Sequence, residues 1–282
     1  MNKINPSAVL LCSAIFLSLT AYSQVVKLVF NKGAKYETTS VTKSSTVSTM
    51  MGQDIESISE NTMVQTIEIK NIKDTATDLV STFTKIKVNT TVMGQEMNYD
   101  SDNKNNEGPL ADVFGKMVGK AKNITINANG KLVSEDHSSD SLSEGMDMMM
   151  GSSLGSGIPM IQAGLVGRNI SIGAMWPDSM VSNSGKLKIS VVGSYTVKQI
   201  ENNIATIDFT GTQNMSGSIE QMGQEMNMTS SGKFSNQIQL NLSTGLIMEN
   251  TYKISSTGNV DAMGMSIPTS VSTTVSNKVK AL

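Results

Sequence analysis

The chain of 282 residues contains few of the side chains on which most protein chemistry depends. It has one cysteine, Cys12, one histidine, His137, and one arginine, Arg168. Because Cys12 lies in an N-terminal apolar run, the rest of the chain can form no disulfide, cysteine nucleophile or thiolate metal site. Aromatic residues make up 4% of the chain and charged residues 16%, with a net charge of −2. A nucleic-acid partner is therefore disfavoured, since binding to phosphates needs a basic surface.

The side chains that catalysis would need are equally scarce. His137 lies in a polar stretch, residues 136–140, that is typical of a solvated loop, and no Gly-x-Ser-x-Gly motif frames a nucleophile. Two Ser-x-x-Lys spacings, which begin at Ser40 and Ser230, fall in strand-like sequence, where residues three apart point to opposite faces. Glycosidase chemistry would need two carboxylates in an aromatic-rich sugar cleft. The sequence therefore predicts no catalytic residue, no metal site and no cofactor, and we expect that the protein is not an enzyme.

The first 23 residues have the layout of a secretory signal peptide. Lys3 gives a positive start, residues 8–19 are apolar, and the small residues Ala21 and Ser23 precede the expected cleavage site. The apolar run is too short for a spanning helix, and no small residue precedes Cys12 as a lipoprotein signal would require. Cleavage after Ser23 removes 23 of the 282 residues and leaves 259. We expect an exported protein, periplasmic or extracellular, that does not span the membrane after cleavage.

Met-Gly pairs recur along the mature chain and indicate β-hairpin turns, because glycine supplies the positive φ of a tight strand connection. The spacing of the four pairs is regular, and one further turn, at 71–75 or 243–245, lies between the members of each half. We therefore predict two five-stranded antiparallel meanders, at 25–105 and 183–282, that arose by internal duplication. The pairs are Met51-Gly52, Met93-Gly94, Met222-Gly223 and Met263-Gly264.

Apolar and polar residues alternate along the predicted strands, which is typical of a sheet with one dry and one wet face. Strands of this length twist strongly and tend to curl. The predicted fold class is therefore mainly β: a single domain, 24–282, with a large curled antiparallel sheet or half-barrel and an apolar concave face. The apolar positions of the two clearest strands are Leu187, Ile189, Val191, Ile238, Leu240 and Leu242.

The connector at 106–182 is predicted to cover the concave face. Leu110 to Lys120 has apolar residues on one side and follows a proline, which favours a short helix. Residues 123–135 predict a hairpin around Asn129-Gly130. Residues 139–165 are rich in methionine and glycine, which suits short helices or a flap, and residues 170–176 are expected to return as a strand.

Four segments resemble the DUF6263 family, exported proteins found mainly in Bacteroidetes whose function is unassigned. They are the Met-Gly hairpin with its continuation at 93–101, the strand and glycine turn at 127–132, the glycine-then-tryptophan strand at 172–176, and the Thr-Gly hairpin at 240–247. The resemblance implies no catalytic residues. In architecture the family is similar to the curled sheets of LolA/LppX-type lipoprotein carriers, although fold alone does not fix function.

The leading functional hypothesis is a binder or carrier of a lipid or another apolar small molecule. Methionine adapts its shape to irregular ligands, so the methionine-rich part of the connector is predicted to be a lid over walls formed by the alternating strands. The same residues would also suit a dry core. The expected lid residues are Met146, Met148, Met149, Met150, Leu154, Met160, Ile161 and Leu165, and the expected walls are Leu187, Ile189, Val191, Ile238, Leu240 and Leu242.

Three alternatives remain at the level of sequence. The clustered methionines at 146–150 suggest a Cu(I) site, because thioethers bind Cu(I), although methionine is abundant throughout this chain. A structural or surface protein of the envelope, acting through an unknown protein partner, would also use long Ser/Thr-rich strands. An outer-membrane barrel fits the signal peptide and long hairpins, but barrels carry aromatic girdles that this sequence has too few aromatic residues to form.

Overall fold

The structure is a computed structural model that describes residues 24–136 and 158–282, except residues 185, 222–223 and 263. The expected signal peptide and most of the methionine-rich segment lie outside the described residues. The N-terminal half holds β1 (Gln24–Val25), β2 (Lys35–Met50), β3 (Gln53–Ile72), β4 (Ala76–Val92), β5 (Gln95–Asp100), α1 (Pro109–Phe114), β6 (Ala121–Asn127) and β7 (Leu132–Glu135).

The C-terminal half begins with a 3₁₀ turn and continues almost entirely as strands. Its elements are η1 (Ala163–Leu165), β8 (Asn169–Ile170), β9 (Met175–Ser184), β10 (Leu187–Glu201), β11 (Ile204–Gln221), β12 (Gln224–Asn241), β13 (Leu246–Ala262) and β14 (Met265–Ala281). Within the described part of the chain, no helix is long and apolar enough to cross a membrane.

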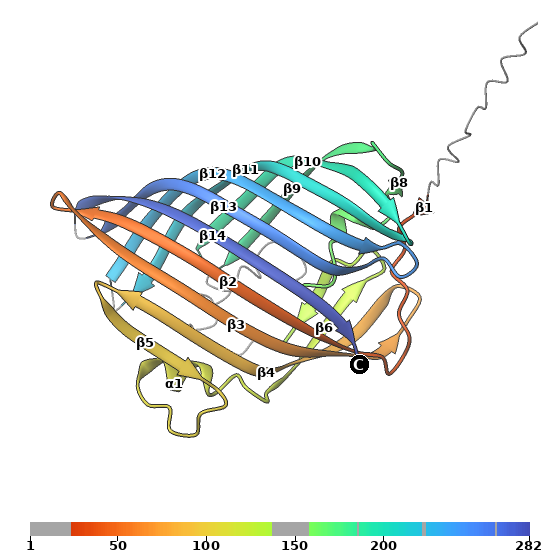
Figure 1. The fold of residues 1–282 in the computed structure, drawn as a ribbon, viewed down its shortest axis with the longest axis horizontal. Coiled ribbons are helices and arrows are strands. Elements are labelled where there is room, and N and C mark those ends of the chain that lie inside the picture. Colours follow the sequence, from red (N-terminus) through yellow and green to blue (C-terminus); the bar gives the residue numbers. More distant parts are fainter. Residues whose placement is uncertain (1–23, 137–157, 185, 222–223, 263) are drawn as a thin grey trace, which may run out of the picture.

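Twelve strands of the described residues form one antiparallel sheet in the order β7-β6-β4-β3-β2-β14-β13-β12-β11-β10-β9, with β5 paired to β4. The sheet curls, so that β2–β4 lie in front in Figure 1 and β9–β12 lie behind, but it is not closed into a barrel. The N- and C-terminal halves are similar and meet where β14 pairs with β2. The predicted mainly-β, curled antiparallel fold is confirmed.

The meanders differ in detail from the prediction. The second contributes the five expected strands, β10–β14, and β9 extends it by a sixth that the prediction had placed largely in the connector. The first contributes four strands to the large sheet, β2–β5. The remaining N-terminal strand, β1, is only two residues long and pairs with β8 in a small separate sheet, as Gln24 lies opposite Ile170.

Part of the connector, which was predicted to cover the concave face, instead extends the sheet. The hairpin around Asn129-Gly130 exists as β6 and β7, but β6 pairs with β4 and so extends the sheet. The predicted helix is shorter than expected, since α1 ends at Phe114. It packs on the concave face of β3–β5, where Phe114 joins a cluster with Met63 and Tyr99. The strand expected at 170–176 is interrupted at Gly173, whose φ of 81° separates β8 from β9.

The two ends of the sheet have different turns. We call the end with the Met51, Met93 and Gly264 turns the tip end, and the opposite end, with the 71–75, 202–203 and 243–245 turns, the base end. The C-terminus lies at the base end (Figure 1). Alternate residues of each strand face the concave side, which we call the inner face, and their neighbours face the convex side, which carries mostly Ser, Thr, Lys and Glu.

Candidate functional site

The inner face changes character along the strands, and a row of five aromatic rings marks the change. The rings come from five neighbouring strands, β9 to β13, because the register places their residues close together on the same face. Adjacent ring centroids lie 5.2, 4.7, 5.8 and 5.8 Å apart, within the range of favourable aromatic pairs. We call Trp176, Tyr195, Phe209, Phe234 and Tyr252 the aromatic row.

Between the aromatic row and the base end the interior is a dry core. The segment after residue 157 turns into this end, where Ile247 donates a backbone hydrogen bond of 2.9 Å to the carbonyl of Met160. Glycine is required at position 245, because its φ is 68° and an added Cβ would lie 2.4 Å from the Lys27 carbonyl oxygen. Six of the predicted ligand-binding residues pack here with at most 5% exposure: Met160, Ile161, Leu165, Ile238, Leu240 and Leu242.

Between the aromatic row and the tip end the inner face carries apolar side chains on β9–β12 and at the tips of β13, β14, β2 and β3, and several of them are less completely covered. Met180 lies opposite Val191, and Met215 lies between Ile189 and Ser230. Their side chains are half-buried, in contrast to those of the base core. We call this surface the tip-side inner face; its apolar residues are Met50, Ile55, Met180, Leu187, Ile189, Val191, Met215, Met226, Met228, Val260, Met265 and Ile267.

The structure therefore separates the predicted site residues into three groups. Leu187, Ile189 and Val191 lie on the tip-side inner face, with exposures of 3%, 5% and 0%. The lid residues Met160, Ile161 and Leu165 and the walls Ile238, Leu240 and Leu242 belong to the base core instead. The remaining lid residues, Met146, Met148, Met149, Met150 and Leu154, lie outside the described residues, so their role stays a prediction.

Away from the tip end, the inner face of β14 and β2, with the adjoining parts of β13 and β3, is largely polar, which the prediction of an apolar concave face did not anticipate. The Asn277 amide donates to Asn250 at 3.1 Å, and Asn250 donates to Asn236 at 3.4 Å. The Ser40 hydroxyl donates to the Asn277 carbonyl oxygen at 2.5 Å, which links the two halves of the chain across β14 and β2. The three asparagine side chains are buried and hydrogen-bonded, as most buried polar groups are.

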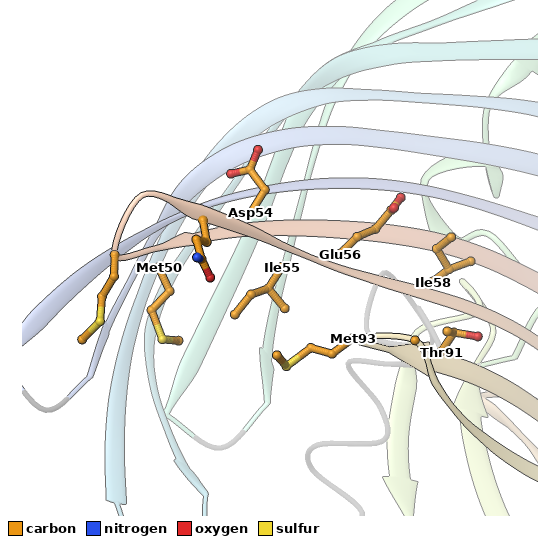
Figure 2. A pocket seen from close by; sticks show the side chains of 10 residues that line it. Met50, Asp54, Ile55, Glu56, Ile58, Thr91 and Met93 are labelled. Carbon is orange, nitrogen blue, oxygen red and sulfur yellow. The ribbon is translucent and has the colours of Figure 1, made fainter.

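A groove of about 620 Å³ opens at the tip end beside β3. The β2–β3 hairpin extends past the end of β4, so residues 53–56 of β3 lie beside the Met93 turn without pairing to β4. In Figure 2 the side chains of Met50, Ile55 and Met93 point to one side of β3, and Asp54 and Glu56 point to the other. The groove is therefore apolar toward the inner face and acidic toward the convex face, and it adjoins the tip-side inner face through Met50 and Ile55.

Titratable groups are sparse on the inner face. Burial, followed by the nearby Asp178 charge, raises the pKa of the Tyr195 hydroxyl far above its ordinary value, so this phenol stays neutral. Arg168 lies over Trp176, with its guanidinium carbon 5.8 Å from the ring centroid, a cation–π contact. In the described ranges no group of three or more His, Asp or Glu side chains is placed to hold a metal ion. His137 lies outside them.

Of the methionines that the sequence pattern named, only Met160 lies within the described residues, and it belongs to the base core. Met180, Met215 and Met228 lie on the tip-side inner face, but the search for clustered methionines passed over them because they are far apart in sequence. The alternation of apolar and polar residues along the strands could have identified them, since each occupies an inward position on its strand. Their proximity depended on the register, which the sequence did not fix.

The family model of DUF6263, a family of unknown function, matches residues 74–156 and 165–247. No curated protein matches the chain. A structure described as "Lipid-protein interactions in lipovitellin" aligns with 89% of this chain at a TM-score of 0.55 and 9% identity, and the chain spans only 25% of that protein's length. This likeness shows a similar fold.

Outer-membrane proteins align less closely. A channel from Pseudomonas putida F1 covers 90% of this chain and 97% of its own length at a TM-score of 0.35 and 9% identity. OmpF of Salmonella typhi, in complex with daunomycin, covers 89% and 99% at a TM-score of 0.25 and 7% identity. These two likenesses are too distant to inform the argument.

Proposed function

The chain belongs to the DUF6263 family, and we propose that it is a non-catalytic binder of a lipid or another apolar molecule, held on the tip-side inner face. The observation that carries the proposal is the contrast along the strands. The base core is packed dry, whereas the methionines of the tip-side inner face, Met180, Met215, Met226 and Met228, remain half-buried on the concave side of the sheet. Apolar surface of this kind is stabilised when a ligand removes it from water.

Methionine gives this surface its adaptability. Met180, Met215 and Met228 project from three strands toward the same side, and the unbranched thioether fills irregular gaps at little cost in strain. A ligand of variable length or branching, such as an acyl chain, suits such a wall better than a rigid ring system. The aromatic row closes the inner end of this surface, so that an apolar chain would lie between the row and the tips.

One polar contact is available to the ligand. Gln213 lies on the inner face next to Val191, is 8% exposed, and its side-chain carbonyl oxygen has no hydrogen-bond partner in the described structure. A buried acceptor without a partner costs about 1–3 kcal/mol. A ligand that carries one hydroxyl or amide donor would recover this energy, and we propose that the natural ligand does so.

The fold likeness to lipovitellin is compatible with this proposal, since the description of that structure concerns lipid–protein interactions. We further propose that the protein acts without catalysis and after export, as the N-terminal signal pattern and the scarcity of catalytic side chains suggest. The similarity to LolA/LppX-type carriers stays a prediction.

The experiment is a binding titration with the apolar fluorescent probe N-phenyl-1-naphthylamine. Met228→Asp places a carboxylate on the tip-side inner face, and Thr229→Asp, one residue along the same strand, places the same charge on the convex face. We expect Met228→Asp to weaken probe binding by tenfold or more, since losing about 1.5 kcal/mol of apolar contact alone gives that factor. Thr229→Asp should bind as the wild type does.

Native mass spectrometry of protein purified without detergent tests the natural ligand. A reproducible extra mass, released by organic solvent and lost in Met228→Asp, would identify the ligand class. Equal probe binding by both variants, together with a ligand-free mass, would refute the proposal and favour the structural or surface role. An added copper mass would instead point to the methionine site at 146–150.

A further inference from the structure

The turns at the tip end expose apolar side chains to an unusual degree. Met51 is 88% exposed and Met93 is 73% exposed, which makes them the two most exposed large apolar residues of the described chain. Met50 beside Met51 is 36% exposed, and Ile58, farther along β3 on its convex face, is 51% exposed. Clustered apolar exposure of this kind marks an interaction surface more often than isolated exposed residues do.

The backbone makes these methionines harder to explain as turn residues. Both have a φ of 52°, in the left-handed region where a side chain with a Cβ is strained. The β10–β11 turn at the base end meets the same demand with Asn202 and Asn203, at φ values of 48° and 65°. Asparagine is well suited to this conformation and methionine is not. Turn geometry therefore does not account for methionine at positions 51 and 93.

The Met51 and Met93 turns contribute to the same surface. Met51 ends the β2–β3 hairpin and Met93 ends the β4–β5 hairpin, and the register of β3 with β4 brings both to the same end of the sheet. They line the two sides of the groove described above, and in Figure 2 the Met50 and Met93 side chains lie on the same side of β3. The Met51 and Met93 turns therefore form an apolar edge that projects beyond the sheet and that could insert into a lipid layer.

Charge narrows the choice of partner. Acidic side chains outnumber lysines among the described residues near the tips: Lys186 lies 3.0 Å from Glu225 and is already paired, and Lys188 lies on the convex face of β10. A surface rich in anionic lipid would be repelled, since Asp54, Glu56 and Glu96 are exposed. A zwitterionic lipid surface imposes no such penalty and accepts apolar side chains at the level of its acyl boundary.

We propose that the Met51 and Met93 turns dock the protein onto a zwitterionic lipid surface by inserting their side chains. This docking is separate from ligand binding on the inner face and does not depend on it. A second copy of the chain could also cover the same methionines, and the experiment distinguishes that occupant.

The test is co-sedimentation of the exported, purified protein with phosphatidylcholine vesicles. Met51→Asn and Met93→Asn remove the apolar side chain and supply the residue that the same backbone conformation carries at position 202. We expect each to weaken vesicle binding by about tenfold and the double variant by about a hundredfold, for about 1.4 kcal/mol of lost burial per side chain. Met175→Asn is the matched control, because Met175 is 68% exposed but lies on β9 near the base end.

The variants should keep or raise the denaturant midpoint, so loss of binding cannot be ascribed to unfolding. Adding phosphatidylglycerol to the vesicles should weaken binding of the protein, and salt should restore part of that binding.

Unchanged vesicle binding in the double variant would overturn the docking proposal, as would stronger binding to anionic vesicles. Concentration-dependent dimers, abolished by the double variant without any vesicle binding, would assign the surface to a second copy. Probe binding on the inner face should stay unchanged in all four variants, so failure here leaves the proposed function standing.

Discussion

Replacing Asn277 by leucine tests whether the polar inner wall is part of the fold's stability. Asn277 is 6% exposed and lies at the junction of the two halves, where it accepts from Ser40 at 2.5 Å and donates to Asn250 at 3.1 Å. Leucine is close in size but can make neither bond. The change therefore removes hydrogen bonding with little change in volume.

The expected cost follows from the partners left behind. The Asn250 side-chain oxygen is buried and loses its donor, which costs about 1–3 kcal/mol, and the two lost bonds contribute about 1 kcal/mol each. The half-buried Ser40 can turn toward water, and the leucine methyls regain roughly 1 kcal/mol of apolar burial. We expect Asn277→Leu to lower the free energy of unfolding by about 2–4 kcal/mol.

Urea denaturation followed by far-UV circular dichroism measures the change. Asn259→Leu is the matched control, because Asn259 lies on the convex face of the neighbouring strand and its replacement should stay within about 0.5 kcal/mol of the wild type. The double variant Asn250→Leu with Asn277→Leu should cost about 1 kcal/mol less than the sum of the single changes, since both remove the same bond. If Asn277→Leu is no more destabilising than Asn259→Leu, the hydrogen-bonded chain contributes nothing to stability and the reasoning is wrong.

Three further changes have definite expected outcomes. Phe209→Ala opens the centre of the aromatic row and should lower the free energy of unfolding by about 3–5 kcal/mol in the same assay. Gly245→Ala should cost at least about 1 kcal/mol, because φ is 68° and the new methyl would meet the Lys27 carbonyl. A hydrogen bond from Lys73 lowers the pKa of Asp78, so its stabilising effect is present above the ordinary aspartate pKa and is lost as pH falls through the lowered folded value.

Each of these has its own control. Phe209→Leu retains most of the apolar volume and should cost clearly less than Phe209→Ala; equal costs would mean that the ring contacts are not specific. Gly264→Ala has a positive φ of 76° but open space around its Cβ position, and therefore isolates the backbone strain from the clash at Gly245. For Asp78, the stability difference between wild type and Asp78→Asn should disappear in strong acid. A difference that persists there would contradict the assigned ion pair.

Much of the fold could be predicted because β-sheet alternation is local. The inward positions Leu187, Ile189 and Val191 were visible from spacing two residues apart, and all are buried. The Met-Gly turns at 51–52 and 93–94 were visible from glycine's tolerance of positive φ, and both are turns. Each of these features depends on a few neighbouring residues, so each can be predicted from the local sequence.

The candidate site could not be predicted in the same way. The aromatic row, the asparagine chain and the tip-side methionines each draw one residue from each of several strands, and the register alone decides which of them meet. A shift of one residue in a strand would turn Met215 to the convex face and Asn214 to the inner face. Met160 and Ile161 were expected in a lid, yet the chain path carries them into the base core.

Local patterns in the sequence specify the long antiparallel strands, their turns and the side of each strand that faces inward, because these follow from alternation and from the backbone conformation of a few neighbouring residues. That β14 pairs with β2, and that the inner face is polar on one side and apolar on the other, depend on the tertiary structure. The junction of the two halves arises from pairings between residues more than two hundred positions apart, such as Ser40 and Asn277. Local propensity carries no information about such partners; the shared burial of both halves selects them.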